Sequence, residues 1–218
     1  MATANTFELD PARVRAAVFD FGGVLMEGGP TDVVAFGTRL GLDRDAWLRL
    51  RADLFGNDGP WAELERGEIS LDRFVDELHR SLLGAGIDVS RDEAAAFMGT
   101  PEPMSAAERL RPALIEEVRR LRRRMPTALL TNNVREWREG WRSLIDVDSL
   151  FDVVVDSSEV GTRKPERRIY EITRERLGVG HDEIFFVDDI GQNLKAARSL
   201  GWQTYLYTDA DALRNVLG

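Results

Sequence analysis

Residues 17–25 read AVFDFGGVL, a short apolar run that leads into Asp20 and then into two glycines. An apolar segment of this length bounded by turn-forming residues is typical of a buried β-strand. Asp20 then stands where that strand ends. Because ligands of open α/β sheets bind at the carboxyl ends of the strands, this stretch indicates both the kind of fold and the place of the candidate site.

Four further segments have the composition of strands, and helix-like patterns separate them. The strand candidates are TALLTN (127–132), EIFFVDD (183–189), FDVVVDS (151–157) and QTYLYT (203–208); the helical patterns include PALIEEVRRLRRR (112–124) and ERRIYEITRERLG (166–178). Strands that alternate with helices form parallel sheets with helices on both faces. The sequence therefore predicts an α/β fold whose core is a Rossmann-like, doubly wound parallel sheet.

Residues 30–103 differ from the rest of the chain, because they carry helical patterns and no convincing strand. The patterns are TDVVAFGTRLG (31–41), RDAWLRLRADLF (44–55), LDRFVDELHRSLLG (71–84) and RDEAAAFM (91–98). An insertion directly after the first strand lies over the strand ends, so we expect a helical cap with hinges at 22–30 and 99–105. The expected domains are a core of residues 1–29 and 104–218 and an inserted cap of residues 30–103.

The composition argues against several classes of protein. Lys and Arg number 29 against 38 Asp and Glu, and the net charge of −9 argues against bulk binding to nucleic acid or to an anionic membrane. With no cysteine, the chain has no disulfide, thiolate nucleophile or thiolate metal site. No segment approaches the roughly 18 continuous apolar residues of a membrane span. We expect a soluble, cytoplasmic protein without nucleic-acid or membrane partners; its oligomeric state is not indicated.

Polar residues gather where the predicted strands end, and together they have the chemistry of a phosphate site. They are the carboxylate of Asp20, the short side chains of Thr131 and Asn132, the ammonium of Lys164 and the acid pair Asp188 and Asp189. Adjacent carboxylates repel each other unless a cation lies beside them, and hard oxygen ligands suit Mg²⁺. Asp20 is then either a third metal ligand or a nucleophile, since a carboxylate can form an acyl phosphate.

These residues lie in four motifs that resemble, in order, those of the haloacid dehalogenase superfamily of hydrolases. The motifs are RAAVFDFGGVL, ALLTNN, RKPERRIY and FFVDDIGQNLKAARSLGW, and they extend over nearly the whole chain. The resemblance is greatest to the N-terminal phosphatase domain of soluble epoxide hydrolases and to related bacterial phosphatases, which also carry a helical cap after the first motif. It implies a phosphoric monoester hydrolase that acts on a small phosphorylated metabolite.

The resemblance also implies roles for the residues of the motifs. Asp20 would be the nucleophile, Thr131 and Asn132 would bind the phosphoryl group, and Lys164 would neutralise charge during catalysis.

Mg²⁺ is the cofactor that the resemblance implies. Its ligands would be Asp20, the backbone carbonyl of Gly22 and Asp189, with Asp188 assisting as the neighbouring acid. Asn193 would either orient this metal site or cap the helix that follows.

Gly22 departs from the family pattern, which usually has a second aspartate two residues after the nucleophile as the general acid. A carbonyl ligand needs no side chain, so the metal site can survive the change, whereas loss of a general acid typically costs about 10²- to 10⁴-fold in rate. A slower phosphatase is therefore expected.

Two alternative functions stay open. One is a phosphoryl-ligand binding or regulatory protein with negligible turnover; the other is a 2-haloacid dehalogenase, against which the acid pair counts. A phosphonate hydrolase of this family needs a lysine from its cap that forms a Schiff base. That activity is nearly excluded, because the predicted cap contains no lysine.

Overall fold

The computed structural model describes residues 10–28, 42–98, 107–209, 211 and 213, and within them five strands form one sheet. The strand order is β3-β2-β1-β4-β5, and each neighbouring pair is parallel. The strands are β1 (Ala16–Phe19), β2 (Thr127–Thr131), β3 (Val153–Asp156), β4 (Ile184–Asp188) and β5 (Gln203–Leu206). The central strand is the one that leads into Asp20.

The strand register determines what meets at the carboxyl edge of the sheet. Phe19, the last residue of β1, lies opposite Leu129 of β2 and Val187 of β4. Asp20 therefore emerges level with Asp188, one residue further along β4. The predicted site residues of three separate strands converge because all the strands run in one direction.

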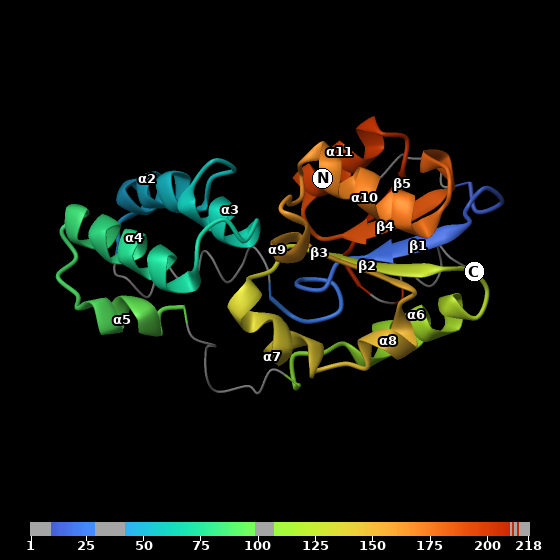
Figure 1. The fold of residues 1–218 in the computed structure, drawn as a ribbon, viewed down its shortest axis with the longest axis horizontal. Coiled ribbons are helices and arrows are strands. Elements are labelled where there is room, and N and C mark those ends of the chain that lie inside the picture. Colours follow the sequence, from blue (N-terminus) through green and yellow to red (C-terminus); the bar gives the residue numbers. More distant parts are fainter. Residues whose placement is uncertain (1–9, 29–41, 99–106, 210, 212, 214–218) are drawn as a thin grey trace.

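Helices cover both faces of the sheet (Figure 1). One face packs against α6 (Pro112–Arg122), α7 (Arg138–Arg142) and α8 (Val147–Leu150), and the other against α10 (Arg167–Leu177) and α11 (Gly191–Ser199). Successive strand residues point to opposite faces, so Phe19 belongs to the first core and Val18 to the second. Short helical turns complete the layers: η1 (Arg135–Trp137), α9 (Ser157–Val160) and η2 (His181–Glu183).

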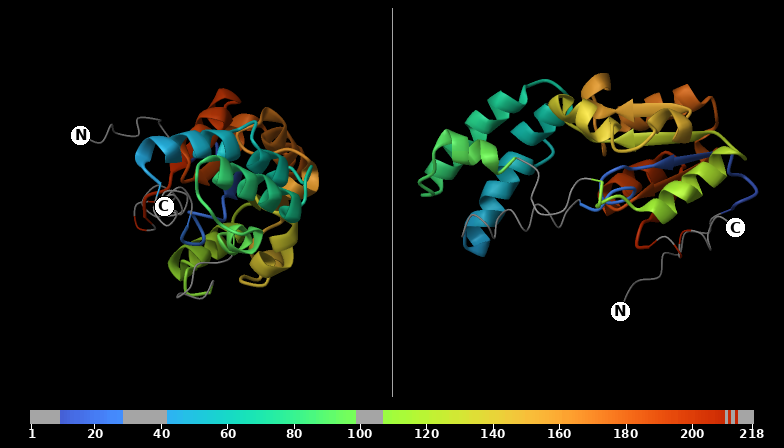
Figure 2. Two further views of the ribbon diagram at one scale, coloured as in Figure 1. Left: turned by 90° about the vertical axis from the view of Figure 1, so that its left-hand side faces the viewer. Right: turned by 90° about the horizontal axis from the view of Figure 1, so that it is seen from below.

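Four helices that follow β1 and precede α6 form a separate layer beside the carboxyl edge of the sheet (Figures 1 and 2). They are α2 (Arg44–Phe55), α3 (Pro60–Glu65), α4 (Leu71–Gly84) and α5 (Arg91–Ala96). We call this layer the cap. Its apolar side chains form their own buried cluster, which includes Leu54, Phe74 and Leu78 and is joined by Val134 from the loop after β2.

The predicted α/β class, parallel sheet and helical insertion are confirmed. All five predicted strands are present, although each is shorter than the sequence pattern; Ser157 and Glu183, for example, lie in the adjoining helical turns. The helical pattern at 31–41, the second hinge at 99–105 and the proposed domain boundaries at 29/30 and 103/104 lie outside the described residues.

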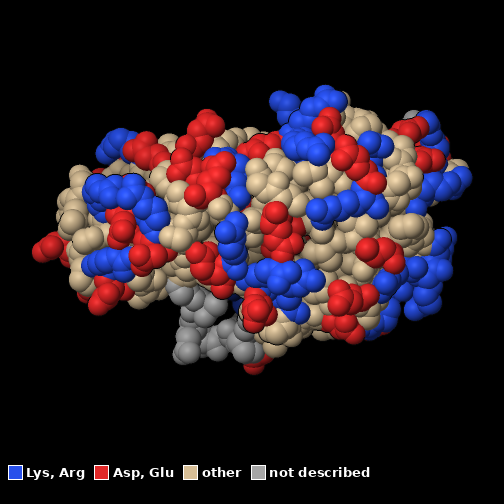
Figure 3. Space-filling view, in the orientation of Figure 1, with Lys and Arg blue, Asp and Glu red and all other residues tan. Residues whose placement is uncertain are grey.

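Basic and acidic side chains lie close to one another on the surface of the described chain. Figure 3 shows basic and acidic side chains interspersed over the cap and the core on one face. Many of them form ion pairs within one helix, such as Arg73 with Glu77 at 2.6 Å. Within the described ranges, the helices are all too short or too polar to cross a bilayer.

Candidate active site

The ends of the central strands bring Asp20, Lys164 and Asp188 into direct contact. Lys164 Nζ lies 2.8 Å from Asp20 Oδ1 and 2.8 Å from Asp188 Oδ2. Lys164 comes from the loop before α10 and is only 1% exposed, while Asp20 is 6% exposed and Asp188 is fully buried. One ammonium between two carboxylates leaves a net negative charge, so the group is suited to a further cation.

Lys164 remains charged in this setting. Burial alone would lower its pKa, but the carboxylates of Asp188 and Asp20 outweigh burial and raise the pKa above the ordinary lysine value. A permanent cation therefore lies within hydrogen-bond distance of the predicted nucleophile.

Asp188 supports this arrangement with both of its oxygens occupied. Its Oδ1 accepts a hydrogen bond from the backbone N–H of Ile190 at 2.7 Å, and Asn193 Nδ2 lies 3.1 Å from each carboxylate oxygen. Tyr170 in turn donates its hydroxyl to the backbone carbonyl of Asn193 at 2.9 Å. Asn193 therefore orients the acid that holds Lys164.

Asp189 is different, because its carboxylate is poorly satisfied. Among the described residues, Asp189 Oδ1 is buried without a hydrogen-bond partner. Oxygen atoms of Asp20, Asp188 and Asp189 lie within 4.8 Å of one another. An unsatisfied buried oxygen beside two further carboxylates is the donor set that a hard divalent cation prefers, so the residues present fit Mg²⁺.

Gly23 makes room for Asp189. Its φ of +79° is in the left-handed region, and a Cβ atom built on it would lie 2.2 Å from Asp189 Oδ2. The turn after Asp20 therefore requires glycine at position 23 both for its backbone conformation and for the close approach of the carboxylate.

The two acids that flank the open side of the site have raised pKa values. Burial raises the pKa of Asp20 to about 8, against the opposing effect of Lys164. Burial, assisted by the charge of Asp188, raises the pKa of Asp189 to about 6. Both carboxyls are thus held in a site that penalises their charged forms unless a cation offsets them.

Gly22 leaves open the position where a side-chain acid would stand. Unlike Gly23, it does not have a positive φ, and a Cβ built on it meets no atom within 4 Å. The backbone therefore tolerates a side chain at this position, and the absence of an acid here is a property of the sequence alone.

Asn132 and Thr131 lie at the end of β2, but their side chains differ in availability. Asn132 is bound on both sides to the backbone of Lys164: its Oδ1 accepts from the Lys164 N–H at 2.8 Å and its Nδ2 donates to the Lys164 carbonyl at 3.0 Å. Thr131 makes only a long contact, 3.4 Å, from its hydroxyl to the Asn132 carbonyl. The Asn132 side chain positions Lys164; phosphoryl binding by these two residues stays a prediction.

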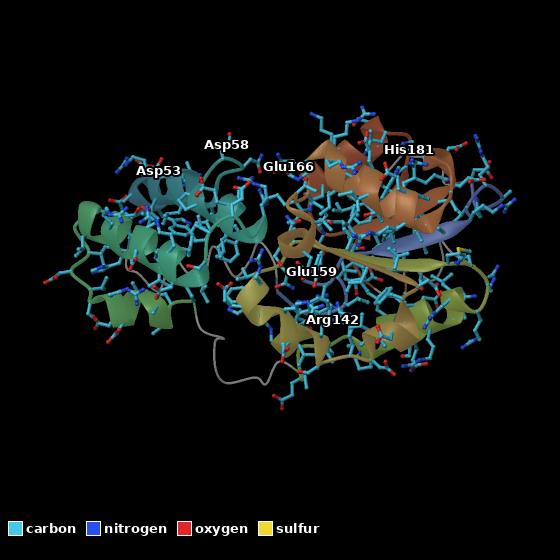
Figure 4. The ribbon with its side chains drawn as sticks, in the orientation of Figure 1. Asp53, Asp58, Arg142, Glu159, Glu166 and His181 are labelled. Carbon is cyan, nitrogen blue, oxygen red and sulfur yellow. The ribbon has the colours of Figure 1, made fainter. Side chains whose placement is uncertain are left out.

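A carboxylate from the cap reaches this edge of the core. Glu65, the last residue of α3, is 7% exposed, and its Oε2 lies 2.6 Å from Arg163 Nε and 3.4 Å from Asn132 Nδ2. Arg66 pairs at 3.0 Å with Glu166, which lies on the side of the core that faces α3 (Figure 4). The cap therefore contacts Arg163 and Glu166, which lie before and after Lys164 in the sequence.

Arg111 holds the turn that follows Asp20. Its Nη1 donates to the backbone carbonyls of Gly23 and Val24 at 2.7 Å and of Met26 at 3.3 Å. Its guanidinium also lies 5.1 Å from the ring centroid of Tyr207.

The structure thus brings together Asp20, Asn132, Lys164, Asp188 and Asp189. Among the described residues, the side chain of Thr131 contacts this group only at the Asn132 carbonyl, and the carbonyl of Gly22 forms no hydrogen bond with it. Sequence reasoning missed four other residues. These are Gly23, Glu65, Arg111 and Arg163. Arg163 and Gly23 adjoin predicted residues in the sequence, so their place beside the site was predictable from the motifs. Glu65 and Arg111 are separated from the rest by tens of residues and carry no motif, so only the tertiary structure reveals them.

Known proteins are similar to this chain over most of its length. The family model of haloacid dehalogenase-like hydrolases matches residues 14–201. Bifunctional epoxide hydrolase 2 of Mus musculus is 31% identical over 93% of this chain and 38% of its own length. D-ribitol-5-phosphate phosphatase of Bacteroides thetaiotaomicron is 27% identical over 88% of this chain and 91% of its own.

A solved structure has the same fold. It is a haloacid dehalogenase family enzyme of Bacteroides thetaiotaomicron in complex with magnesium and inorganic phosphate, with a TM-score of 0.64, 22% identity and coverage of 92% of this chain and 98% of that chain. The chain spans only 17% to 38% of the length of several curated relatives that it matches.

Proposed function

The chain belongs to the haloacid dehalogenase-like hydrolases, and from this premise we propose that it is a Mg²⁺-dependent phosphatase of small phosphomonoesters. The observation that carries the proposal is the contact of Lys164 with both Asp20 and Asp188, beside the unsatisfied carboxylate of Asp189. This arrangement combines a carboxylate nucleophile, a fixed cation and a set of hard oxygen ligands at one strand edge.

Asp20 is the nucleophile in this proposal. Its Oδ1 accepts from the Phe21 N–H at 2.7 Å and pairs with Lys164, and neither contact uses Oδ2. Oδ2 attacks phosphorus while the bond from phosphorus to the ester oxygen breaks, and water then hydrolyses the aspartyl-phosphate to inorganic phosphate and free Asp20. Lys164 stabilises the negative charge of the phosphoryl oxygens during both steps.

The carboxylates of Asp20 and Asp189 and the carbonyl of Gly22 would hold Mg²⁺, with Asp188 behind them. The ion would offset the charge of the phosphate and of the acids around it. The metal complex of the Bacteroides enzyme supports the choice of ion, and the ribitol-phosphate phosphatase supports a small phosphorylated substrate.

A panel of phosphomonoesters assayed with and without Mg²⁺ tests the proposal. We expect turnover that EDTA abolishes and that Asp20→Asn reduces to background, because the amide is isosteric but cannot attack phosphorus. Asp189→Ala should lose both activity and Mg²⁺ binding, as measured by isothermal titration calorimetry. Retained turnover in purified Asp20→Asn protein would refute the nucleophile.

Gly22 favours a second candidate, a protein that binds a phosphoryl ligand and hydrolyses it negligibly. The same panel separates the two. Stabilisation of the fold by Mg²⁺ together with inorganic phosphate, without turnover of any ester, would favour the binding protein.

A further inference from the structure

Glu65 is the one buried acid that the described part of the cap contributes. The other buried acids in the described ranges, Asp20, Glu117, Asp156 and Asp188, belong to the core. Glu65 ends α3, which packs against α9 at the carboxyl edge of the sheet. Its carboxylate contacts Asn132, whose amide holds the backbone of Lys164. One side chain therefore separates Glu65 from the lysine that contacts Asp20.

The cap side of the site is where a leaving group must depart. In phosphoryl transfer the attacking and leaving oxygens lie roughly in line through phosphorus. Asp20 attacks from the strand end, so the ester oxygen lies on the opposite side of the phosphoryl group, toward the cap. Glu65 belongs to the cap and contacts Asn132 at this edge, whereas Gly22 offers no side chain on the core side.

The surroundings of Glu65 favour proton exchange. Arg163 from the loop before α10, Trp61 from α3, Asn132 from the end of β2 and the more distant charge of Lys164 face its carboxylate. Burial raises the pKa of Glu65 above the ordinary glutamate value, although Arg163 opposes it. The negative charge of a bound phosphoester raises the pKa further, so the acid form is stabilised when substrate is present.

On the basis of the phosphatase activity proposed above, we propose that Glu65 is the general acid and base that Gly22 lacks. Glu65 donates its proton to the ester oxygen as the P–O bond breaks and the bond from Asp20 Oδ2 to phosphorus forms, which releases the alcohol. The Glu65 carboxylate then takes a proton from the water that attacks the aspartyl-phosphate. Inorganic phosphate leaves, and both acids return to their starting forms.

The test compares leaving groups of different basicity in Glu65→Gln. Alkyl esters such as glycerol phosphate need a proton to leave, whereas p-nitrophenyl phosphate does not. We expect kcat/KM for alkyl esters to fall by about 10²- to 10⁴-fold and that for the aryl ester to fall much less. The basic limb of the pH–rate profile for alkyl esters should also disappear, because it reports ionisation of the acid.

Two control variants separate the loss of a proton donor from the loss of a surface charge or of the ion pair. Glu68→Gln removes an exposed carboxylate of the same turn, paired with Arg66 at 2.9 Å, and should leave both rates unchanged. Arg163→Gln breaks the same ion pair as Glu65→Gln but keeps the acid, so it should change the two rates by similar factors. In Glu65→Gln, adding Gly22→Asp should restore a large part of the alkyl rate, because the new carboxyl has room.

Each result bears on a different claim. If the unsubstituted protein hydrolyses neither ester, the phosphatase proposal fails. If it hydrolyses both and Glu65→Gln lowers the two rates equally, with the fold intact by circular dichroism, the phosphatase proposal stands and Glu65 is not the acid. If Gly22→Asp raises the alkyl-ester rate by the same factor in the unsubstituted protein and in Glu65→Gln, the role of Glu65 is likewise overturned.

Discussion

At the scale of single residues, the site holds charges that burial disfavours. Burial raises the pKa of Asp20 to about 8 in the metal-free protein, far above the ordinary value of an aspartate. A carboxyl whose pKa is higher in the folded than in the unfolded state stabilises the fold only while it is protonated. Its contribution is complete below about pH 4 and is lost as the pH rises through 8. At neutral pH the buried carboxyl of Asp20 therefore lowers the stability of the metal-free fold.

We expect Asp20→Asn to stabilise the metal-free protein increasingly from pH 4 to pH 8. The amide cannot ionise, so it avoids the cost that the buried carboxylate incurs at higher pH. Thermal melts in EDTA should show nearly equal midpoints near pH 4 and a midpoint higher by several degrees for the variant near pH 8, since about 1 kcal/mol corresponds to roughly 2–4 °C at this chain length. A difference that shrinks as the pH rises would contradict the raised pKa.

At the scale of elements, the turn after β1 depends on one guanidinium from the segment that precedes α6. Arg111 binds the carbonyls of Gly23, Val24 and Met26, and Gly23 packs directly against Asp189. The position of the turn is therefore coupled through backbone contacts to the position of Asp189, the proposed metal ligand.

We expect Arg111→Met to weaken Mg²⁺ binding by about tenfold or more, because loss of outer supporting contacts typically costs 10- to 100-fold in metal affinity. Calorimetric titration of the variant with Mg²⁺ measures this directly. The matched control is Arg13→Met, which removes an exposed arginine paired with Asp182 far from the turn. Unchanged affinity in Arg111→Met would show that the turn keeps its position without the guanidinium.

A second element-scale contact gives the fold a pH dependence. The fully buried Trp202 donates its indole N–H to Nδ1 of His181 at 3.0 Å, at the end of the core remote from the cap (Figure 4). Burial, with the nearby Arg174 and Arg167, lowers the pKa of His181 below 6.5. The neutral ring stabilises the fold above about pH 6.5, and this stability is lost as the pH falls below that value toward the folded pKa.

We expect His181→Gln to remove part of the acid sensitivity below pH 6.5. A glutamine oxygen can accept from the indole at every pH, so the difference in unfolding free energy between the two proteins should decrease as the pH falls from 7 to 5. Urea unfolding monitored by circular dichroism at several pH values measures it. A constant difference over this range would mean that the pKa of His181 is the same in the folded and the unfolded protein.

At the scale of the whole molecule, the cap and the core share apolar contacts as well as ion pairs. The cap cluster takes in Val134, and Trp61 of α3 lies with its ring centroid 6.0 Å from that of Trp137. Together with the pair of Arg66 and Glu166, these contacts join residues distant in sequence. We propose that the two parts, divided at residues 29/30 and 103/104, unfold together.

We expect Phe74→Ala, at a fully buried position of the cap cluster, to destabilise the whole chain by about 3–5 kcal/mol. Because the cluster extends into the core, calorimetry and circular dichroism should show a single transition at a lower temperature. Two separate transitions, with the core melting as before, would show that the cap unfolds on its own.

The sequence alone determined the architecture and the chemical character of the site. The apolar runs that end in Asp20, Thr131 and Asp188 were sufficient, because parallel strands necessarily deliver their carboxyl ends to one edge. The helical insertion was equally readable, since amphipathic periodicity is a local property of the chain.

Only the tertiary structure decided which side chains support that site and which are free to react. Asn132 is bound to the backbone of Lys164, Asp188 has both oxygens occupied, and Asp189 retains an unsatisfied one. Glu65 and Arg111 reach the site from helices and loops that are distant along the chain. Hydrogen bonding and burial depend on where folded segments meet in space, and no local pattern of residues encodes that meeting.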